Sequence, residues 1–483
     1  MASLSSVANN NELHVVMFPW LAFGHMMPFL ELSKRLAERG HRVSFVSTPR
    51  NIQRLPKIPP SLSSLVHLVE LPLSPTDGLP ENAEATVDLS YHKVQYLKKA
   101  FDGLEGPLTR FLESSSPDWI LHDFAPHWLS PITAKLGLPS AFFSLFNASA
   151  LAFFGPPNAL LGGDDDCRTK PEDFTVPPKW VPFPLAFRLY EILRMVDGLD
   201  RNASGVSDTY RIGSAVLGCD IVVIRSCMEF ESESDCLRLL EEKIYCKPVI
   251  PVGLLPLAAP AVKDAMGEDD KWLDQQGRGS VVYVAFGSEV TLSQEDVTEL
   301  AVGLELSELP FFWVLRKPSS LTQEEWGLLP DGFEERTKGR GVVCRGWAPQ
   351  QRILAHPSVG GFLTHCGWSS IIEALEFGHA FILLPYLADQ GLNARLLAWR
   401  KLGVEIQRDE RSGSFTRSSV AESLRLVMVS DEGAELRANA RKMAEMVGNK
   451  QLHDQYVDHL ISYMQENRRS HVTRKAWPLK PGK

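Results

Sequence analysis

Short apolar runs recur along the first half of the chain, and segments with the spacing of amphipathic helices separate several of them. Because nearly every position in these runs is apolar, they predict strands buried on both faces, as in a parallel sheet covered by helices. One intervening helix is predicted within the segment 27–40, with Pro28 in its first turn and Gly40 just past its end. The predicted strands of the first half are 14–20, 42–48, 65–71, 119–123, 140–146 and 220–226.

The same alternation resumes in the second half, after a stretch rich in Pro, Ala and Gly that has no sustained period. We interpret that stretch, residues 248–270, as a linker. It divides the chain into two α/β lobes, residues 1–247 and 271–455, and ligands are expected at the carboxyl ends of their strands. Helical patterns continue from about residue 416, and no repeat is visible. The predicted strands of the second half are 280–288, 311–317, 341–347, 359–365 and 381–386.

Composition narrows the class of protein. A hydrophobic share of 44% and a charged share of 23% over 483 residues are typical of a globular chain with more than one core. The net charge of −9 argues against nucleic-acid binding, which requires a basic face. No run approaches the ~18 apolar residues of a membrane helix, and the N-terminus does not resemble a secretory signal. Seven cysteines without a C-x-x-C motif are typical of a reducing cytosol, so we expect a cytoplasmic protein.

The segment 347–390 contains the most residues that are suited to binding a ligand. A predicted strand ends at THCGWSS and a helix opens there with Ser369 or Ser370 as N-cap, so its free N–H groups could bind a pyrophosphate. His365 could donate to a phosphate oxygen, and Glu373 could accept from ribose hydroxyls. Ser370 and Glu373 also fit a capping box, which is a purely structural alternative.

Three more side chains of this segment suit a nucleotide sugar. Trp347 offers a flat surface for a base, and Asp389 with Gln390 offers acceptors and an amide donor for sugar hydroxyls. Each also has a structural alternative, because a Trp at a strand end usually packs and an Asp-Gln pair in a loop is usually solvated. All of these residues, however, follow neighbouring predicted strands.

A histidine near the N-terminus is a second candidate for chemistry. His25 directly follows the first predicted strand and opens a helix, whose N-terminus should disfavour the imidazolium and keep the ring neutral. Taken alone, such a histidine is more often a structural residue than a catalyst. His14, His122 and His127 are weaker candidates.

The segment 347–390 resembles the C-terminal signature box of plant UDP-dependent glycosyltransferases, in length and at many spaced positions. The resemblance implies a UDP-sugar donor, with uracil on Trp347, ribose on Glu373 and the sugar on Asp389 and Gln390. His365, Ser370 and Ser288 would hold the diphosphate. The matching and neighbouring positions expected at the donor site are Ser288, Trp347, Ala348, Gln350, His365, Gly367, Trp368, Ser369, Ser370, Glu373, Tyr386, Asp389 and Gln390.

The sequence departs from the family pattern within this box. Ser369 stands where the family usually has Asn, and as a shorter group it would reach the phosphate through water. Ala380 replaces a usual Pro, and Leu384 replaces a usual Trp near the sugar. These departures bear on the identity of the sugar more than on nucleotide binding.

The resemblance covers residues 14–465 and implies the GT-B fold, two facing Rossmann-like domains of α/β class, with residues 456–483 packing back on the first. It also implies that His25 is the catalytic base and that Asp123 holds its ring. The N-terminal sequence resembles a branch whose members add glucose or rhamnose to a terpenoid or flavonoid glycoside. The acceptor pocket is expected around residues 180–205 and at Phe124, His127, Trp128, Phe142 and Phe143.

The reaction implied is a single inverting displacement by an acceptor hydroxyl, without a metal, in a monomer. Glucose is the expected sugar and UDP-rhamnose the alternative donor. We interpret the acidic run 164–166 as a solvated loop and not a metal motif. A nicotinamide-dependent oxidoreductase is excluded because no G-x-G-x-x-G motif follows a strand. A catalytically silent nucleotide-sugar-binding protein is the alternative of another class, and it would lack His25 or Asp123.

Overall fold

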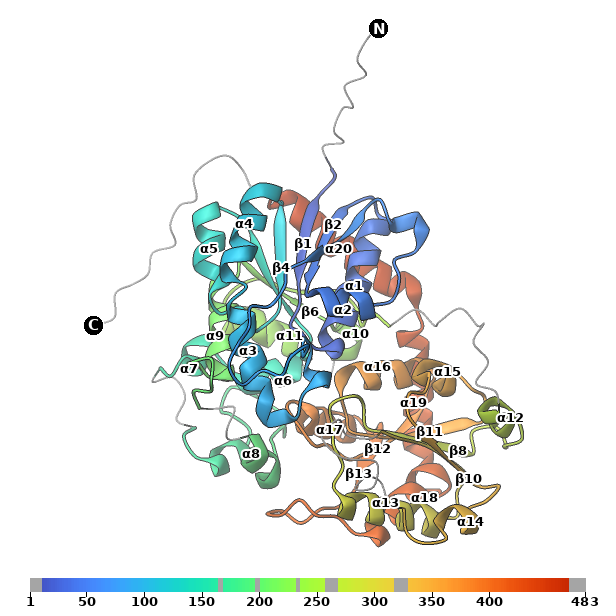
Figure 1. The fold of residues 1–483 in the computed structure, drawn as a ribbon. Helices are drawn as coiled ribbons and strands as arrows, with labels where there is room; N and C mark the ends of the chain where they lie inside the picture. Colours follow the sequence, from blue (N-terminus) through green and yellow to red (C-terminus); the bar gives the residue numbers. More distant parts are fainter. Residues whose placement is uncertain are drawn as a thin grey trace.

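The chain folds into two lobes, each built on a parallel β-sheet (Figure 1). The computed structural model describes residues 11–163, 168–195, 200–231, 235–256, 268–316 and 329–468. In this part of the chain the first sheet has seven strands, ordered β3-β2-β1-β4-β5-β6-β7, and the second has six, ordered β10-β9-β8-β11-β12-β13. The predicted α/β fold with two parallel sheets is thereby confirmed.

The central strands are apolar at most positions because helices cover both faces of each sheet. Every residue of β1, β5, β8 and β9 is buried. The strands of the first sheet are β1 (His14–Phe18), β2 (Arg42–Ser47), β3 (Val66–Glu70), β4 (Trp119–His122), β5 (Ser140–Ser144), β6 (Ile221–Ile224) and β7 (Val249–Pro251). Those of the second are β8 (Val281–Ala285), β9 (Phe311–Leu315), β10 (Gly341–Arg345), β11 (Val359–Thr364), β12 (Ala380–Leu383) and β13 (Gly403–Glu405).

Helices connect successive strands. Several begin at capping side chains; Ser293, for example, accepts a hydrogen bond of 3.0 Å from the N–H of Asp296 at the start of α13. The α-helices of the first lobe are α1 (Phe23–Glu38), α2 (Pro49–Arg54), α3 (Val94–Asp102), α4 (Glu105–Ser115), α5 (Leu129–Leu136), α6 (Ala148–Phe154), α7 (Pro157–Leu160), α8 (Leu189–Met195), α9 (Asp208–Gly218), α10 (Met228–Glu231) and α11 (Cys236–Leu239). Those that follow are α12 (Glu268–Asp274), α13 (Gln294–Ser307), α14 (Phe333–Arg336), α15 (Gln350–Leu354), α16 (Trp368–Glu376), α17 (Gln390–Trp399), α18 (Arg417–Met428), α19 (Ala434–Val447) and α20 (Lys450–Glu466).

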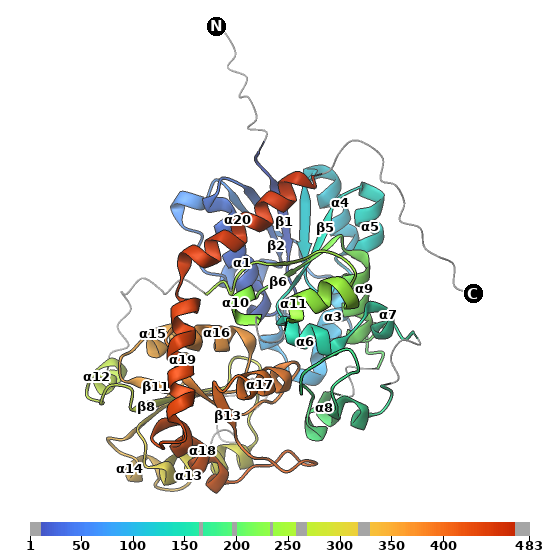
Figure 2. The same cartoon turned by 180° about the vertical axis from the view of Figure 1, so that it is seen from behind.

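The last helix returns from the second lobe to the first (Figure 2). Asp454 of α20 accepts hydrogen bonds from Arg35 and Arg39 of α1, at 3.2 and 3.1 Å. The indole of Trp119 in β4 donates to the carbonyl of Met464 at 2.9 Å. The chain therefore crosses between the lobes a second time, and α20 packs on the first sheet.

Some elements differ from the prediction. The first sheet continues through β7, inside the segment 248–270 that was expected to be a linker, and the short edge strand β13 was not predicted. Both have three residues, too few to show a period. Helix α1 begins at Phe23, so Pro28 lies beyond its first turn, whereas Gly40 follows its end as predicted. The acidic run 164–166 lies outside the described residues.

Candidate active site between the lobes

His25 and Asp123 lie side by side where two neighbouring strands of the first sheet end. His25 is the third residue of α1, which follows β1, and Asp123 directly follows β4. The His25 Nδ1 and the Asp123 Oδ2 are 2.6 Å apart. Asp123 is buried and also accepts from the backbone N–H groups of Trp20 (3.1 Å) and Phe124 (2.7 Å). Since a carboxylate can only accept, Nδ1 carries a proton and Nε2 is the nitrogen left for chemistry.

The pKa of His25 does not follow the prediction from the helix N-terminus. Burial alone would lower this pKa, but the charge and hydrogen bond of Asp123, helped by the charges of Glu289 and Asp389, raise it above its usual value of 6.5. A carboxylate at hydrogen-bond distance outweighs the partial charge of a helix terminus. The expectation that the helix N-terminus sets the charge state of the ring is therefore wrong.

The opposite side of the site is the turn between β11 and α16. His365 is buried there, and its pKa is lowered to about 4 by burial, so the ring is neutral. A Cβ on Gly287 would lie 2.7 Å from this ring, and one on Gly367 would lie 2.5 Å from its Nε2. The imidazole is thus held between two glycines, and Cys366 between His365 and Gly367 has a left-handed φ of 68°.

Helix α16 begins earlier than predicted. Its N-cap is Gly367, so neither Ser369 nor Ser370 caps it, and the predicted capping box of Ser370 and Glu373 is wrong. Gln350 instead donates to both of these side chains, at 3.1 Å to Ser370 Oγ and 2.7 Å to Glu373 Oε2. Burial raises the pKa of Glu373, while the bond from Gln350 and the charge of Arg225 lower it. Glu373 is therefore free of a capping role.

The two tryptophans of the signature box have opposite surroundings. Trp347, just after β10, is 76% exposed. Trp368 is buried; its indole donates to the carbonyl of Arg225 at 3.1 Å and packs edge-on against Phe230 of the first lobe. The side chain of Trp368 thus belongs to the contact between the lobes, and only its backbone remains at the predicted donor site. The indole of Trp347 is therefore open to a ligand.

Asp389 and Gln390 lie at the start of α17, after β12. Asn393 donates to Asp389 Oδ2 at 2.8 Å, and the N–H groups of Tyr386 and Leu387 donate to Gln390 Oε1 at 3.0 and 2.9 Å. The amide oxygen of Gln390 is therefore engaged, and its NH₂ group is what remains for a ligand. Burial raises the pKa of Asp389 to about 6, against opposing contributions from Asn393 and His25.

The hydroxyl of Tyr386 is buried and has no hydrogen-bond partner among the described residues. Its ring packs on Phe286 and under the guanidinium of Arg408. Two of the three family departures are buried here: Ala380 begins β12, and Leu384 directly follows it. Leu384 therefore presents no open surface to a sugar.

Polar contacts join the lobes beside this site. Thr86 of the first lobe donates to Glu289 of the second at 2.6 Å. Asn147, the N-cap of α6, donates to Asn393 at 2.7 Å, and both side chains are buried. Asn393 thus connects the first lobe to Asp389. Sequence reasoning missed this role, because Asn147 and Asn393 are far apart in the chain.

The residues expected in the acceptor pocket separate into two groups. Phe124 packs near His25 at a ring-centroid distance of 5.8 Å, and the partly exposed His127 accepts from Arg211 at 3.2 Å. Phe142 and Phe143 of β5 are 0% exposed, and Trp128 is buried against Phe18 and Phe101. The prediction that Phe142 and Phe143 line the acceptor pocket is therefore wrong, because a central strand directs its side chains into the two cores. Trp128, at the start of α5, is 9% exposed, as Phe124 is, and its place in the pocket stays a prediction.

Comparison with known proteins shows the family to which this chain belongs. Residues 213–444 match a family model described as "UDP-glucoronosyl and UDP-glucosyl transferase". UDP-glycosyltransferase 91C1 of Arabidopsis thaliana is 51% identical over 94% of this chain and 96% of that protein. The chain belongs to the plant UDP-glycosyltransferases. Soyasaponin III rhamnosyltransferase of Glycine max is 42% identical over 96% of the chain and 98% of that protein.

Solved structures agree with this family. The Phytolacca americana UGT2 complex with UDP-2fluoro-glucose and pterostilbene superposes with a TM-score of 0.75, at 25% identity, over 94% of this chain and 99% of that one. The predicted GT-B fold of the UDP-glycosyltransferase is confirmed.

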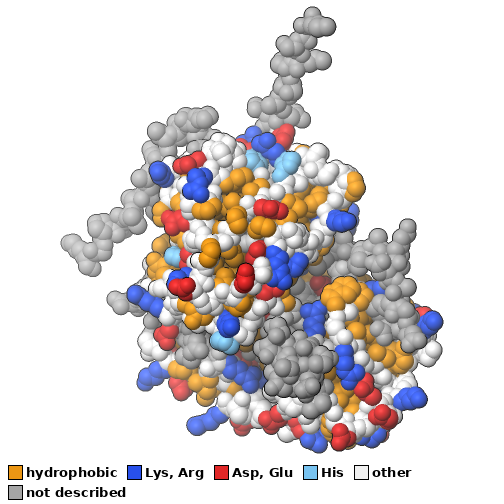
Figure 3. Space-filling view, in the orientation of Figure 1, with side chains coloured by type: hydrophobic (Ala, Val, Ile, Leu, Met, Phe, Trp, Pro, Cys, Tyr) orange, Lys and Arg blue, Asp and Glu red, His pale blue; other side chains and the backbone are white. Residues whose placement is uncertain are grey.

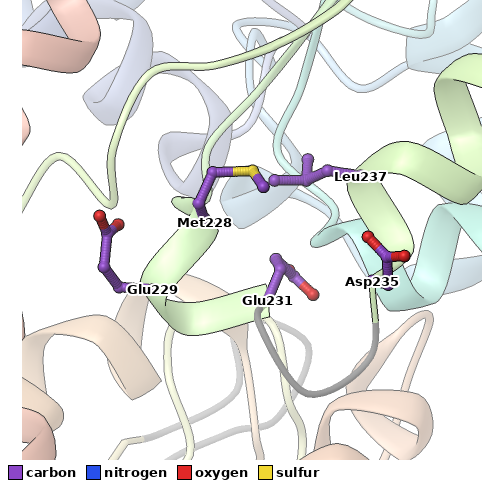
Figure 4. Close-up of a pocket in the computed structure, with 5 residues that line it drawn as sticks. All are labelled: Met228, Glu229, Glu231, Asp235 and Leu237. Carbon is purple, nitrogen blue, oxygen red and sulfur yellow. The ribbon is translucent and has the colours of Figure 1, made fainter.

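Other features of this UDP-glycosyltransferase lie apart from the predicted site. A hollow of about 400 Å³ is lined by Met228, Glu229, Glu231, Asp235 and Leu237, none of which was predicted to bind donor or acceptor (Figure 4). Among the described residues, no cluster of His, Cys, Asp and Glu suits a metal ion, and no helix is long and apolar enough to cross a membrane. On the face seen in Figure 3, acidic and basic side chains are intermixed.

Proposed function

We propose that this UDP-glycosyltransferase transfers a hexose, glucose in the first instance, from its UDP-sugar to a hydroxyl of a small plant metabolite or of its glycoside. The observation that carries the proposal is the His25–Asp123 pair of the first lobe, which lies close enough to Asp389 of the second lobe for their charges to interact. A silent nucleotide-sugar-binding protein would have no need of a buried carboxylate oriented on a histidine.

The donor would lie along the carboxyl ends of the strands of the second sheet. The exposed indole of Trp347 would stack on uracil, and Glu373, positioned by Gln350, would accept from ribose hydroxyls. The neutral His365 ring and the first N–H groups of α16 would donate to the diphosphate, with Ser288 and Ser370 beside them. Asp389 and the NH₂ group of Gln390 would hold sugar hydroxyls.

The chemistry is a single displacement. His25 Nε2 takes the proton of the acceptor hydroxyl while its oxygen forms a bond to the anomeric carbon, opposite the departing UDP. The bond from that carbon to the diphosphate oxygen breaks with its electron pair, so the configuration inverts and UDP leaves as an anion. Asp123 stabilises the imidazolium that forms, as the aspartate does in hydrolase triads. The scheme requires no metal.

A second donor, UDP-rhamnose, is favoured by one observation. A relative that is 42% identical is named a rhamnosyltransferase of soyasaponin III. That name also supports an acceptor of the terpenoid glycoside class, while the pterostilbene bound to the Phytolacca americana protein supports phenolic acceptors. We propose a cytoplasmic monomer, with residues 1–247 contributing most of the acceptor site and residues 271–455 the donor site.

The test is a donor-by-acceptor screen with product detection by mass spectrometry. UDP-glucose, UDP-galactose and UDP-rhamnose are combined with flavonoid and terpenoid aglycones and with their monoglycosides. Wild type is run beside His25→Ala and beside His67→Ala, a control histidine exposed on β3. Product formed by wild type and His67→Ala, and lost in His25→Ala, is the expected result. No product from any pair despite tight UDP binding would support the silent binder instead.

A further inference from the structure

A buried arginine of the first lobe reaches the proposed diphosphate site. Arg225 directly follows β6 and is 1% exposed. Its Nε donates to the carbonyl of Leu254 at 2.7 Å and its Nη2 to that of Leu255 at 3.0 Å. Its Nη1 donates to Ser369 Oγ, in the first turn of α16, at 2.7 Å. The guanidinium therefore spans from the end of the first sheet to the helix that faces the donor.

The charge of Arg225 has no acidic counterpart in direct contact. No carboxylate within the described residues forms an ion pair with it. Burial lowers its pKa to about 10, so the group remains a cation at neutral pH. A buried charge is costly unless it is compensated, and two backbone carbonyls supply only partial charges. The charges of Glu373 and Glu31 favour the cation from a distance, without contacting it. An anion bound at the start of α16 would complete the compensation.

The contact also determines how Ser369 can act. The N–H of Arg225 occupies a lone pair of Ser369 Oγ, so the hydroxyl proton is directed to a different acceptor. Donation by a cation also polarises that O–H group. The carbonyl of Arg225 meanwhile accepts from the indole of Trp368, which fixes the first turn of α16 against the arginine.

We propose that Arg225 is a positioning residue for the diphosphate of the donor, acting through the hydroxyl of Ser369. The inference rests on the proposed function, since it concerns the same donor site. The pair of Ser369 and Arg225 would supply what the amide of an Asn supplies at that position elsewhere in the family: an N–H or O–H donor with a fixed direction. Unlike an amide, the pair also carries a positive charge toward the oxygens on which charge develops as the anomeric bond breaks.

The experiment is a calorimetric titration of the full chain with UDP and, separately, with uridine, which lacks the phosphates. Arg225→Met is expected to weaken UDP binding about 10- to 100-fold, the range for a lost hydrogen bond that involves a charged group, and to leave uridine binding unchanged. Arg225→Lys should restore part of the loss. Ser369→Ala should reproduce it, and the double variant should lose no more than either single one.

A further variant tests whether the pair of Ser369 and Arg225 takes the place of the family's Asn. In the Arg225→Met background, Ser369→Asn should recover UDP affinity, because an amide needs no partner to direct its N–H groups. Should Arg225→Met fail to fold, Ser369→Ala and Arg225→Lys carry the test. Equal losses for UDP and uridine would show a merely structural arginine and overturn the inference, as would unchanged UDP affinity in Ser369→Ala. Wild type that binds no UDP would overturn the proposed function itself.

Discussion

Replacing Asp389 with asparagine should make the ligand-free protein more stable and less active. Burial raises the pKa of this carboxyl from its usual 3.8 to about 6. Between those two values the folded state binds a proton more tightly than the unfolded chain does. Folding stability therefore falls as pH rises through this window, and the full cost is present above about pH 6.

The magnitude follows from the size of the shift. About two pKa units at 1.36 kcal/mol each give at most about 3 kcal/mol at pH 7.5, and about half of that at pH 5. An asparagine avoids this cost and can still accept from Asn393, which donates to Asp389 at 2.8 Å. We expect a thermal midpoint a few °C higher than wild type at pH 7.5, with a smaller gain at pH 5. Sugar transfer should fall because an acceptor for sugar hydroxyls is weakened.

The assay is thermal unfolding of the ligand-free protein at both pH values, together with kcat/KM for the best donor. Asp77→Asn, at an exposed position, is the matched control and should change neither quantity. A lower midpoint in Asp389→Asn, or a gain that does not depend on pH, would refute the argument that burial of this charge costs stability. Gains of this kind are typical of residues retained for function at the expense of stability.

Three further predictions concern the same site. Asp123→Asn should lower kcat on the order of 10³- to 10⁴-fold and move the acid limb of the pH–rate profile to lower pH, because Asp123 raises the pKa of the His25 base; an unmoved limb would argue against that coupling. Trp347→Ala should weaken UDP binding about 5- to 100-fold, as expected for lost base stacking, with an unchanged thermal midpoint because the indole is 76% exposed. Gly287→Ala should weaken UDP binding about tenfold, on the scale of one hydrogen bond, because φ is 68° and the new Cβ would displace His365; calorimetric affinity equal to wild type would contradict this.

Much of the fold could be predicted because a buried strand appears in the sequence as a continuous run of apolar residues. The predicted strands 14–20 and 280–288 are apolar at most positions, and they contain the fully buried strands β1 and β8. The donor box could be located for a similar reason: a strand, a tight turn and a helix are contiguous in the chain. Short edge strands such as β7 and β13 carry no comparable signal, since three residues do not establish a period.

What the sequence by itself determined was the two-lobed α/β architecture, the family, and which residue types stand at the ends of the strands. Only the tertiary structure decided which of them meet. Trp368 turned toward Phe230 of the other lobe, and Arg225 reached Ser369 across 144 positions of the chain. The pKa of His25 was likewise decided by carboxylates from both lobes. The physical reason is that burial leaves a local pattern in the chain, whereas charge and hydrogen-bond partnership depend on distances between segments that only folding brings together.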